Sequence, residues 1–149
     1  MRVALLIISL ILISISFSAN AQLEPWADYD ISDKVWSVTT VKVDPNLGDD
    51  YLEGLRDSWV AANKVAKSLG QIVDYSIYRS ETPQGGDFNL LLVVEFENSA
   101  ALEPNKEQYQ AFMKEWGEKR RERSREIVKD YPSMRTITGE YRVRKIDIK

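Results

Sequence analysis

The sequence predicts an α+β domain in which a four-stranded antiparallel sheet carries two main helices on one face, in the order β-α-β-β-α-β. Three observations predict this fold. Residues 87–97 (DFNLLLVVEFE) form an apolar run that is too short for a stable helix and has no polar face in its middle, which is typical of a covered strand. Residues 34–43 and 134–148 alternate between apolar and polar positions, as strands do. Residues 50–69 and 105–116 carry apolar side chains at the spacing of amphipathic helices.

The first 21 residues have the composition of a secretory signal peptide. Residues 3–17 are apolar, and Ala19-Asn20-Ala21 offers small residues for cleavage. We therefore expect a periplasmic or secreted protein with no membrane segment after cleavage. An uncleaved membrane anchor is less favoured, because the apolar stretch is short for a span. Residues 22–33 are expected to form an irregular arm and residues 34–149 the folded domain.

The first half of the domain has signals at each boundary. Residues 34–43 are the first strand, and residues 44–48 (DPNLG) have the composition of a turn. Asp50 and Glu53 have the spacing of a capping box at the start of the first helix. Gly70 is placed to end that helix.

The second half begins with a strand over residues 72–80 and a hairpin loop over residues 81–86, which lead into the apolar strand. Asn105 and Gln108 have capping-box spacing at the start of the second helix. Gly117 is a point where that helix could kink. Right-handed crossovers place the first strand and the apolar strand in the middle of the sheet, with the other two at its edges.

Residues 118–130 (EKRRERSREIVKD) mix charges of both signs. A solvated helix with weak ion pairs between its turns is favoured over an anion-binding patch, because the acidic residues nearly cancel the basic ones.

Residues 34–148 resemble the ferredoxin-like fold. The resemblance lies in the order and lengths of the elements and in the Leu/Val-rich strand that precedes an aromatic-bearing helix. More narrowly, these residues resemble the dimeric α/β-barrel superfamily, which includes cofactor-free monooxygenases and haem-degrading enzymes. The resemblance implies that two sheets face each other across a dimer axis, with a pocket between sheet and helices or inside the barrel. The haem-degrading members commonly use a His ligand, which this chain lacks, and no monooxygenase motif aligns. No catalytic residue is therefore assigned.

The composition narrows the chemistry further. The chain has 149 residues, no Cys, no His and a net charge of −3. The commonest general base, haem ligand and zinc ligand are thus missing, and disulfides are excluded. We expect no cofactor and no metal site, although carboxylates alone could still hold a hard cation. A mildly acidic chain is also a poor candidate for nucleic-acid binding.

Strand parity predicts which side chains share a face of the sheet. If Leu90, Leu92 and Val94 face the helices, then Ile137, Tyr141 and Val143 should do so too. The helix-free face then carries an apolar patch of Trp36, Val38, Leu91 and Val93, through which we expect a homodimer. The candidate ligand-binding residues on this face are Trp36, Asp74, Tyr78, Asn89, Glu95 and Arg142.

Strand directions predict that Asp74, Glu95 and Arg142 gather near Trp36 at one rim. Glu95 would be a general base or cation ligand with a pKa raised by burial, and Arg142 would hold an anionic group of the ligand. The alternative is that Glu95 and Arg142 form an ion pair in the dimer interface.

These expectations lead to three functional hypotheses. The first is an exported, homodimeric small-ligand-binding protein with its pocket on the helix-free sheet face. The second is a cofactor-independent monooxygenase or isomerase acting on a small aromatic compound. The third is a structural module of the cell envelope without a ligand.

Overall fold

The computed structural model describes residues 22–82 and 86–149, so the expected signal peptide and the tip of the hairpin loop lie outside the described residues. Its main sheet is antiparallel and has the strand order β3-β4-β2-β5. The strands are β2 (Val35–Val43), β3 (Asp74–Arg79), β4 (Leu90–Phe96) and β5 (Arg135–Val143). This is the predicted ferredoxin-like order, and the first strand and the apolar strand form the middle of the sheet as expected.

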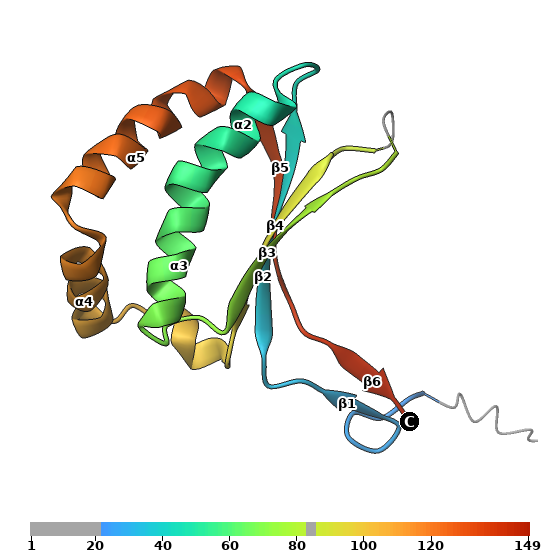
Figure 1. The fold of residues 1–149 in the computed structure, drawn as a ribbon. Coiled ribbons are helices and arrows are strands. Elements are labelled where there is room, and N and C mark those ends of the chain that lie inside the picture. The colour runs from blue at the N-terminus through green and yellow to red at the C-terminus, as the bar shows by residue number, and fades with distance from the viewer. Residues whose placement is uncertain (1–21, 83–85) are drawn as a thin grey trace, which may run out of the picture.

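One face of this sheet carries the helices, in two layers (Figure 1). The inner layer is a continuous rod made of α2 (Gly48–Leu55), a π-helical turn (η2, Arg56–Val60) and α3 (Ala61–Ser68). The outer layer consists of α4 (Lys106–Trp116), which contacts α3, and α5 (Glu118–Asp130), which contacts the π-helical turn. The second predicted helix is therefore two helices, and much of it covers the first helix instead of the sheet. Short 3-10 turns at Ser99–Leu102 (η3) and Tyr131–Ser133 (η4) flank the outer layer.

The observed helix ends show which of the predicted capping residues are correct. The Asn105 side chain accepts a hydrogen bond from the Gln108 backbone N–H at 3.0 Å, so the predicted cap of α4 is confirmed. Gly70 and Gly117 have φ angles of +68° and +75°, a region open mainly to glycine, which ends α3 and separates α4 from α5. The predicted cap at Asp50 is wrong, because the first helical hydrogen bond runs from the Tyr51 N–H to the Leu47 carbonyl. Asp50 thus lies inside the first turn, where its charge still favours the helix dipole.

A β-bulge in β5 corrects the predicted faces of this strand. Thr40 of β2 pairs with Gly139, but its neighbour Val41 pairs with Ile137, so Thr138 is an extra residue. The prediction that Ile137 faces the helices is confirmed, because it pairs with the core residue Val41. Beyond the bulge the parity is reversed. The prediction was therefore wrong for four residues: Tyr141 and Val143 lie on the helix-free face, while Glu140 and Arg142 lie on the helix side.

The predicted arm and the end of the predicted last strand form a separate two-stranded ribbon. β1 (Tyr29–Ile31) pairs antiparallel with β6 (Ile146–Ile148), and the ribbon projects away from the main sheet (Figure 1). Arg144 fixes its base by donating hydrogen bonds to the backbone carbonyls of Ser32 and Asp33 at 2.7 and 2.9 Å. The arm is thus partly regular, and the last strand of the main sheet ends at Val143.

The hydrophobic core lies between the main sheet and the inner rod. Val41, Val43, Leu90 and Leu92 come from the two middle strands, as strand parity predicts. Tyr51 and Leu55 of α2 pack on them, together with Tyr131, which follows α5. The rings of Tyr51 and Tyr131 meet edge to face, with centroids 4.9 Å apart. Within the part of the chain that the structure describes, no helix combines the length and apolar character needed to cross a bilayer.

Candidate functional site

Three of the six predicted site residues lie side by side on the helix-free face. Glu95 of β4 pairs with Trp36 on one side and with Asp74 on the other, so the three side chains form one row across the sheet. Tyr78 is on the same face, nearer the opposite rim, where it pairs with Leu91. The predicted clustering at one rim is confirmed for this row.

Both carboxylates of the row are ion-paired. The Lys34 ammonium donates to Glu95 at 2.7 Å, and this bond raises the pKa of Lys34. The Lys67 ammonium lies 2.9 Å from Asp74, and its hydrogen bond lowers the pKa of Asp74. Lys34 therefore occupies the position that had been predicted for Arg142 as the partner of Glu95. A carboxylate in such a pair is a weaker candidate for a general base than an unpaired one.

Arg142 and Asn89 do not join this row. Arg142 pairs with Ser37 and lies on the helix side, where it lines a hollow with Ser99 and Leu102. The Asn89 side chain is bound to the backbone of β2: its amide oxygen accepts from the Val43 N–H and its amide nitrogen donates to the Val43 carbonyl, both at 2.8 Å. Asn89 thus extends the ladder between the two middle strands, a structural role that its sequence position did not indicate.

The helix-free face is apolar and aromatic across its centre. Tyr78, Tyr141 and Val143 are exposed over 56%, 54% and 44% of their surface. The Tyr141 ring lies across Gly139, where an added Cβ would meet the ring at 2.6 Å. We call this surface the open face, and it consists of Trp36, Val38, Ser76, Tyr78, Leu91, Val93, Tyr141 and Val143.

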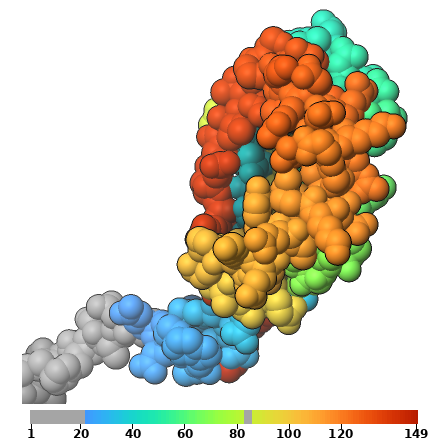
Figure 2. Space-filling view, turned by 90° about the vertical axis from the view of Figure 1, so that its left-hand side faces the viewer, coloured from blue at the N-terminus to red at the C-terminus, as the bar shows by residue number. Residues whose placement is uncertain are grey.

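An open hollow lies on the other side of the sheet. It has a volume of about 330 Å³, and Figure 2 shows it as a gap between α5 and β5 through which β2 is visible. Val128 and Ile137 on its two sides are exposed over 45% and 43% of their surface. We call this hollow the helix-side cleft, and it is lined by Thr39, Val41, Tyr51, Leu55, Ser58, Trp59, Ala62, Leu92, Ser124, Val128, Tyr131, Arg135, Ile137 and Glu140.

The polar groups of the cleft gather around Arg135. Its guanidinium carbon lies 5.6 Å from the centre of the Tyr131 ring, and its buried Nε–H has no hydrogen-bond partner. Burial raises the pKa of Tyr51 and Tyr131, an effect that Arg135 partly offsets at Tyr51. The hydroxyls of Tyr131 and Ser58 are 2.6 Å apart. The cleft therefore combines apolar walls with a cation and hydroxyl groups at one end, as small-molecule sites do.

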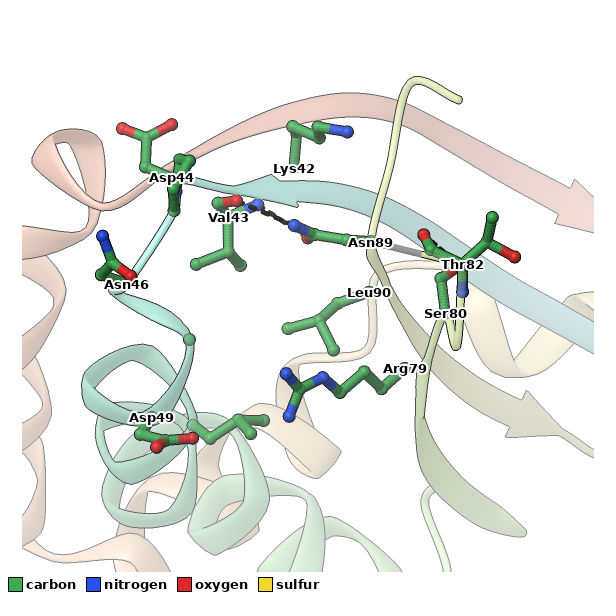
Figure 3. A pocket seen from close by; sticks show the side chains of 13 residues that line it. Lys42, Val43, Asp44, Asn46, Asp49, Arg79, Ser80, Thr82, Asn89 and Leu90 are labelled. Carbon is green, nitrogen blue, oxygen red and sulfur yellow. Dashed lines mark hydrogen bonds between the residues drawn. The ribbon is translucent and has the colours of Figure 1, made fainter. Parts of the chain in front are cut away.

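A second hollow, of about 420 Å³, lies near the start of α2 (Figure 3). Figure 3 shows Arg79 extending from β3 toward the helix that carries Asp49. Both of these charged side chains are exposed, and the amide of Asn89 at its edge is already bound to Val43. This hollow is therefore a weaker candidate than the helix-side cleft.

Comparisons with known proteins give only distant likenesses. No family model and no curated protein matches the chain. Protein HapK from Hahella chejuensis is 12% identical, with a TM-score of 0.45 over 74% of this chain and 91% of its own. A dimeric protein of unknown function and ferredoxin-like fold from Bacteroides fragilis is also 12% identical, with a TM-score of 0.43 over 80% and 100%. Protein SO0527 from Shewanella oneidensis is 11% identical, with a TM-score of 0.44 over 80% and 99%. Likenesses this distant carry no information about the ligand or assembly of the present chain.

Proposed function

We propose that this chain is an exported, homodimeric small-molecule-binding protein of the dimeric α/β-barrel type, and that its ligand occupies the helix-side cleft. The observation that carries the proposal is the cleft itself. A packed ferredoxin-like domain would fill the space between its second helix and its sheet, because protein interiors rarely leave voids larger than a water molecule. Here α5 stands away from β5 and leaves about 330 Å³ between apolar walls.

The dimer is supported by the open face. Soluble monomers rarely expose a contiguous apolar patch of this kind, whereas a second copy would cover it. The open face and the helix-side cleft lie on opposite sides of the sheet, so a partner on one leaves the other accessible. The ion-paired row of Trp36, Asp74 and Glu95 would then lie at the edge of the interface. Export is supported by the composition of residues 1–21.

The cleft proposal is tested with a blocked variant. Ala62 is a half-buried residue of the lining, so Ala62→Trp should fill the cleft, whereas Ala111→Trp adds the same ring at an exposed position of α4. We expect calorimetry to show saturable binding of neutral 2-naphthol to the wild type and to Ala111→Trp, and none to Ala62→Trp. Native mass spectrometry of protein from its own host should report a retained small molecule with the same pattern. Equal binding by both variants, or no saturable binding at all, would overturn the proposal.

The enzymatic alternative keeps less support. A cofactor-independent oxygenase or isomerase needs a positioned base, and Glu95, the expected base, is paired with Lys34. The hydroxyl groups around Arg135 could polarise a bound carbonyl, but Glu140 stands at the opposite end of the cleft. Asp57, near Tyr131, is ion-paired with Arg56 and Arg123. Binding without turnover is therefore the function that the geometry supports best.

A further inference from the structure

The helix-side cleft has opposite charges at its two ends. Arg135 pairs with Val43 in the sheet and Glu140 pairs with Thr39, and both side chains line the cleft. These two partners are four positions apart along β2, which corresponds to about 13 Å at the rise of an extended strand. Between them, Val41, Ile137 and Leu92 form an apolar floor.

Arg135 has no carboxylate partner among the described residues, although its hydrogen bond with the Tyr51 hydroxyl partly offsets the rise that burial causes in the pKa of that phenol. Among the described residues, every ion pair involves other side chains, and the buried Nε–H of Arg135 has no acceptor. An unsatisfied buried donor is costly, more so on a charged group. The adjacent Tyr131 ring stabilises the cation through its π face but accepts no conventional hydrogen bond from it. An incoming carboxylate would satisfy the guanidinium with two parallel hydrogen bonds.

One neighbour of Arg135 adds a donor. The Tyr51 ring packs against Tyr131, and burial keeps the Tyr51 phenol protonated well above neutral pH, so its hydroxyl can donate. The Ser58 hydroxyl donates to the Gly54 carbonyl, so the Tyr131 hydroxyl must donate to Ser58 and has no proton left for a ligand. This end of the cleft thus offers an anion the Arg135 guanidinium and the Tyr51 hydroxyl.

The end of the cleft at Glu140 favours a hydrogen-bond donor and disfavours an anion. Glu140 is exposed at the cleft and forms no ion pair within the described residues. Its carboxylate would repel a second negative charge and accept a hydrogen bond from a hydroxyl or amine of a ligand. A ligand that spans the cleft is therefore expected to bind in one orientation, with its anionic group at Arg135 and its hydrogen-bond donor at Glu140.

We propose that the ligand is an amphipathic carboxylate of about two fused rings, whose carboxylate binds Arg135 and whose far end carries a hydrogen-bond donor facing Glu140. The inference rests on the proposed function and deepens it, because it names the chemical class that the same cleft takes. It also assigns Arg135, instead of the predicted Arg142, as the residue that holds an anionic group.

Three matched probes test the class by isothermal titration calorimetry of the purified protein. They are 6-hydroxy-2-naphthoate, 2-naphthoate and 2-naphthol, which share the same two rings. We expect 6-hydroxy-2-naphthoate to bind most tightly and 2-naphthol to bind about ten- to a hundredfold more weakly, as the loss of a charge-assisted hydrogen bond predicts. Arg135→Met should remove this preference for carboxylates and leave the affinity for 2-naphthol nearly unchanged. Glu140→Gln should weaken only the two hydroxylated probes.

The control is Arg125→Met, which removes an exposed arginine of α5 and should change none of the three affinities. Arg135→Lys keeps the charge without the planar fork and should recover part of the preference. If 2-naphthol binds in the cleft as tightly as the two acids, the ligand class is wrong and the binding function stands. If none of the probes binds, both the class and the function fail.

Discussion

Asn89 is the residue whose role changes most between sequence and structure. Its amide both accepts from and donates to the Val43 backbone, so it replaces a peptide group between β4 and β2. Asn89→Asp would keep the acceptor and lose the donor, and the new charge would face the Val43 carbonyl. We expect the free energy of unfolding to fall by about 1–3 kcal/mol, measured by urea denaturation.

Asn98→Asp is the matched control. The Asn98 side chain only accepts, from the Ala101 N–H at 3.2 Å, and aspartate caps such a turn as well as asparagine. Its unfolding free energy should therefore stay within about 0.5 kcal/mol of the wild type. If Asn89→Asp were equally harmless, Asn89 would be free for ligand binding after all.

The phenols of Tyr51 and Tyr131 predict a loss of stability in alkali. Burial raises the pKa of both above the ordinary value of 10.0. Their contribution to stability is complete below pH 10, and it is lost as the pH rises toward the folded-state pKa values, because the unfolded phenols release their protons first. The slope should reach about 1.4 kcal/mol per pH unit for each phenol.

Urea denaturation between pH 9 and pH 11 measures this slope. Tyr131→Phe should reduce it by about half, since one of the two buried phenols is gone. Tyr109→Phe removes a phenol that is 63% exposed and should leave the slope unchanged. Equal slopes in Tyr131→Phe and the wild type would exclude the buried pair as the cause.

At the scale of elements, the inner rod lies in close contact with α5 and with Tyr131, which follows it. An added Cβ at Gly54 would lie 3.0 Å from Cε1 of Tyr131 and 3.1 Å from Cγ2 of Ile127. Tyr131 cannot move away easily, because it is buried and bonded to Ser58. Gly54→Ala gains helix propensity of up to about 1 kcal/mol, but overpacking costs about 1–3 kcal/mol, so we expect a net loss of about 1 kcal/mol in thermal or urea unfolding.

Gly48→Ala makes the same substitution at the first residue of α2, where nothing lies within 4 Å of the added carbon. It should be neutral or stabilising by a few tenths of a kcal/mol. A stabilising Gly54→Ala would mean that Tyr131 and Ile127 can yield, and that the contact between the rod and α5 is loose.

The fold was predictable to the level of its elements. Strand parity assigned Leu90 and Leu92 to the helices correctly, because β4 is regular, and Gly70 marked the end of the first helix through its positive φ. The same parity failed in β5, because one extra residue at Thr138 reverses the faces. The isolated Gly139 beside it, inside an alternating strand pattern, was the available sign of a bulge. The extra residue moved Arg142 away from Glu95.

The cleft was missed for a different reason. Residues 118–130 contain only Ile127 and Val128 as large apolar residues, so α5 has too narrow an apolar stripe to lie flat on a sheet. That narrow stripe was the available signal. The sequence also did not mark Arg135 as a site residue, because arginine is common at the start of a strand that looks exposed.

For the whole molecule, the sheet separates two surfaces of different character. Its helix side holds the cleft, and its other side presents the open face. The β1–β6 ribbon projects from the end of the sheet, toward the side away from the helices (Figure 1). If the chain dimerises and binds a ligand as proposed, we expect substitutions on opposite faces to change the two properties independently.

Val93→Lys tests this separation. Val93 lies at the centre of the open face, between Val38 and Ser76. In a two-fold dimer, the change removes apolar contacts and places two ammonium groups in the interface, so we expect the dimer to weaken by at least about a hundredfold. Light scattering coupled to size exclusion should report one chain per particle at micromolar concentration, while 2-naphthol still binds.

The control for this variant is Glu122→Lys, which places the same side chain at an exposed position of α5. It should remain dimeric, since α5 is on the far side of the inner rod from the open face (Figure 1). A wild-type protein that is already monomeric would refute the dimer. A Val93→Lys protein that stays dimeric would show that the copies meet elsewhere. Two buried ammonium groups at a symmetric interface would destabilise it by more than the remaining apolar contacts stabilise it.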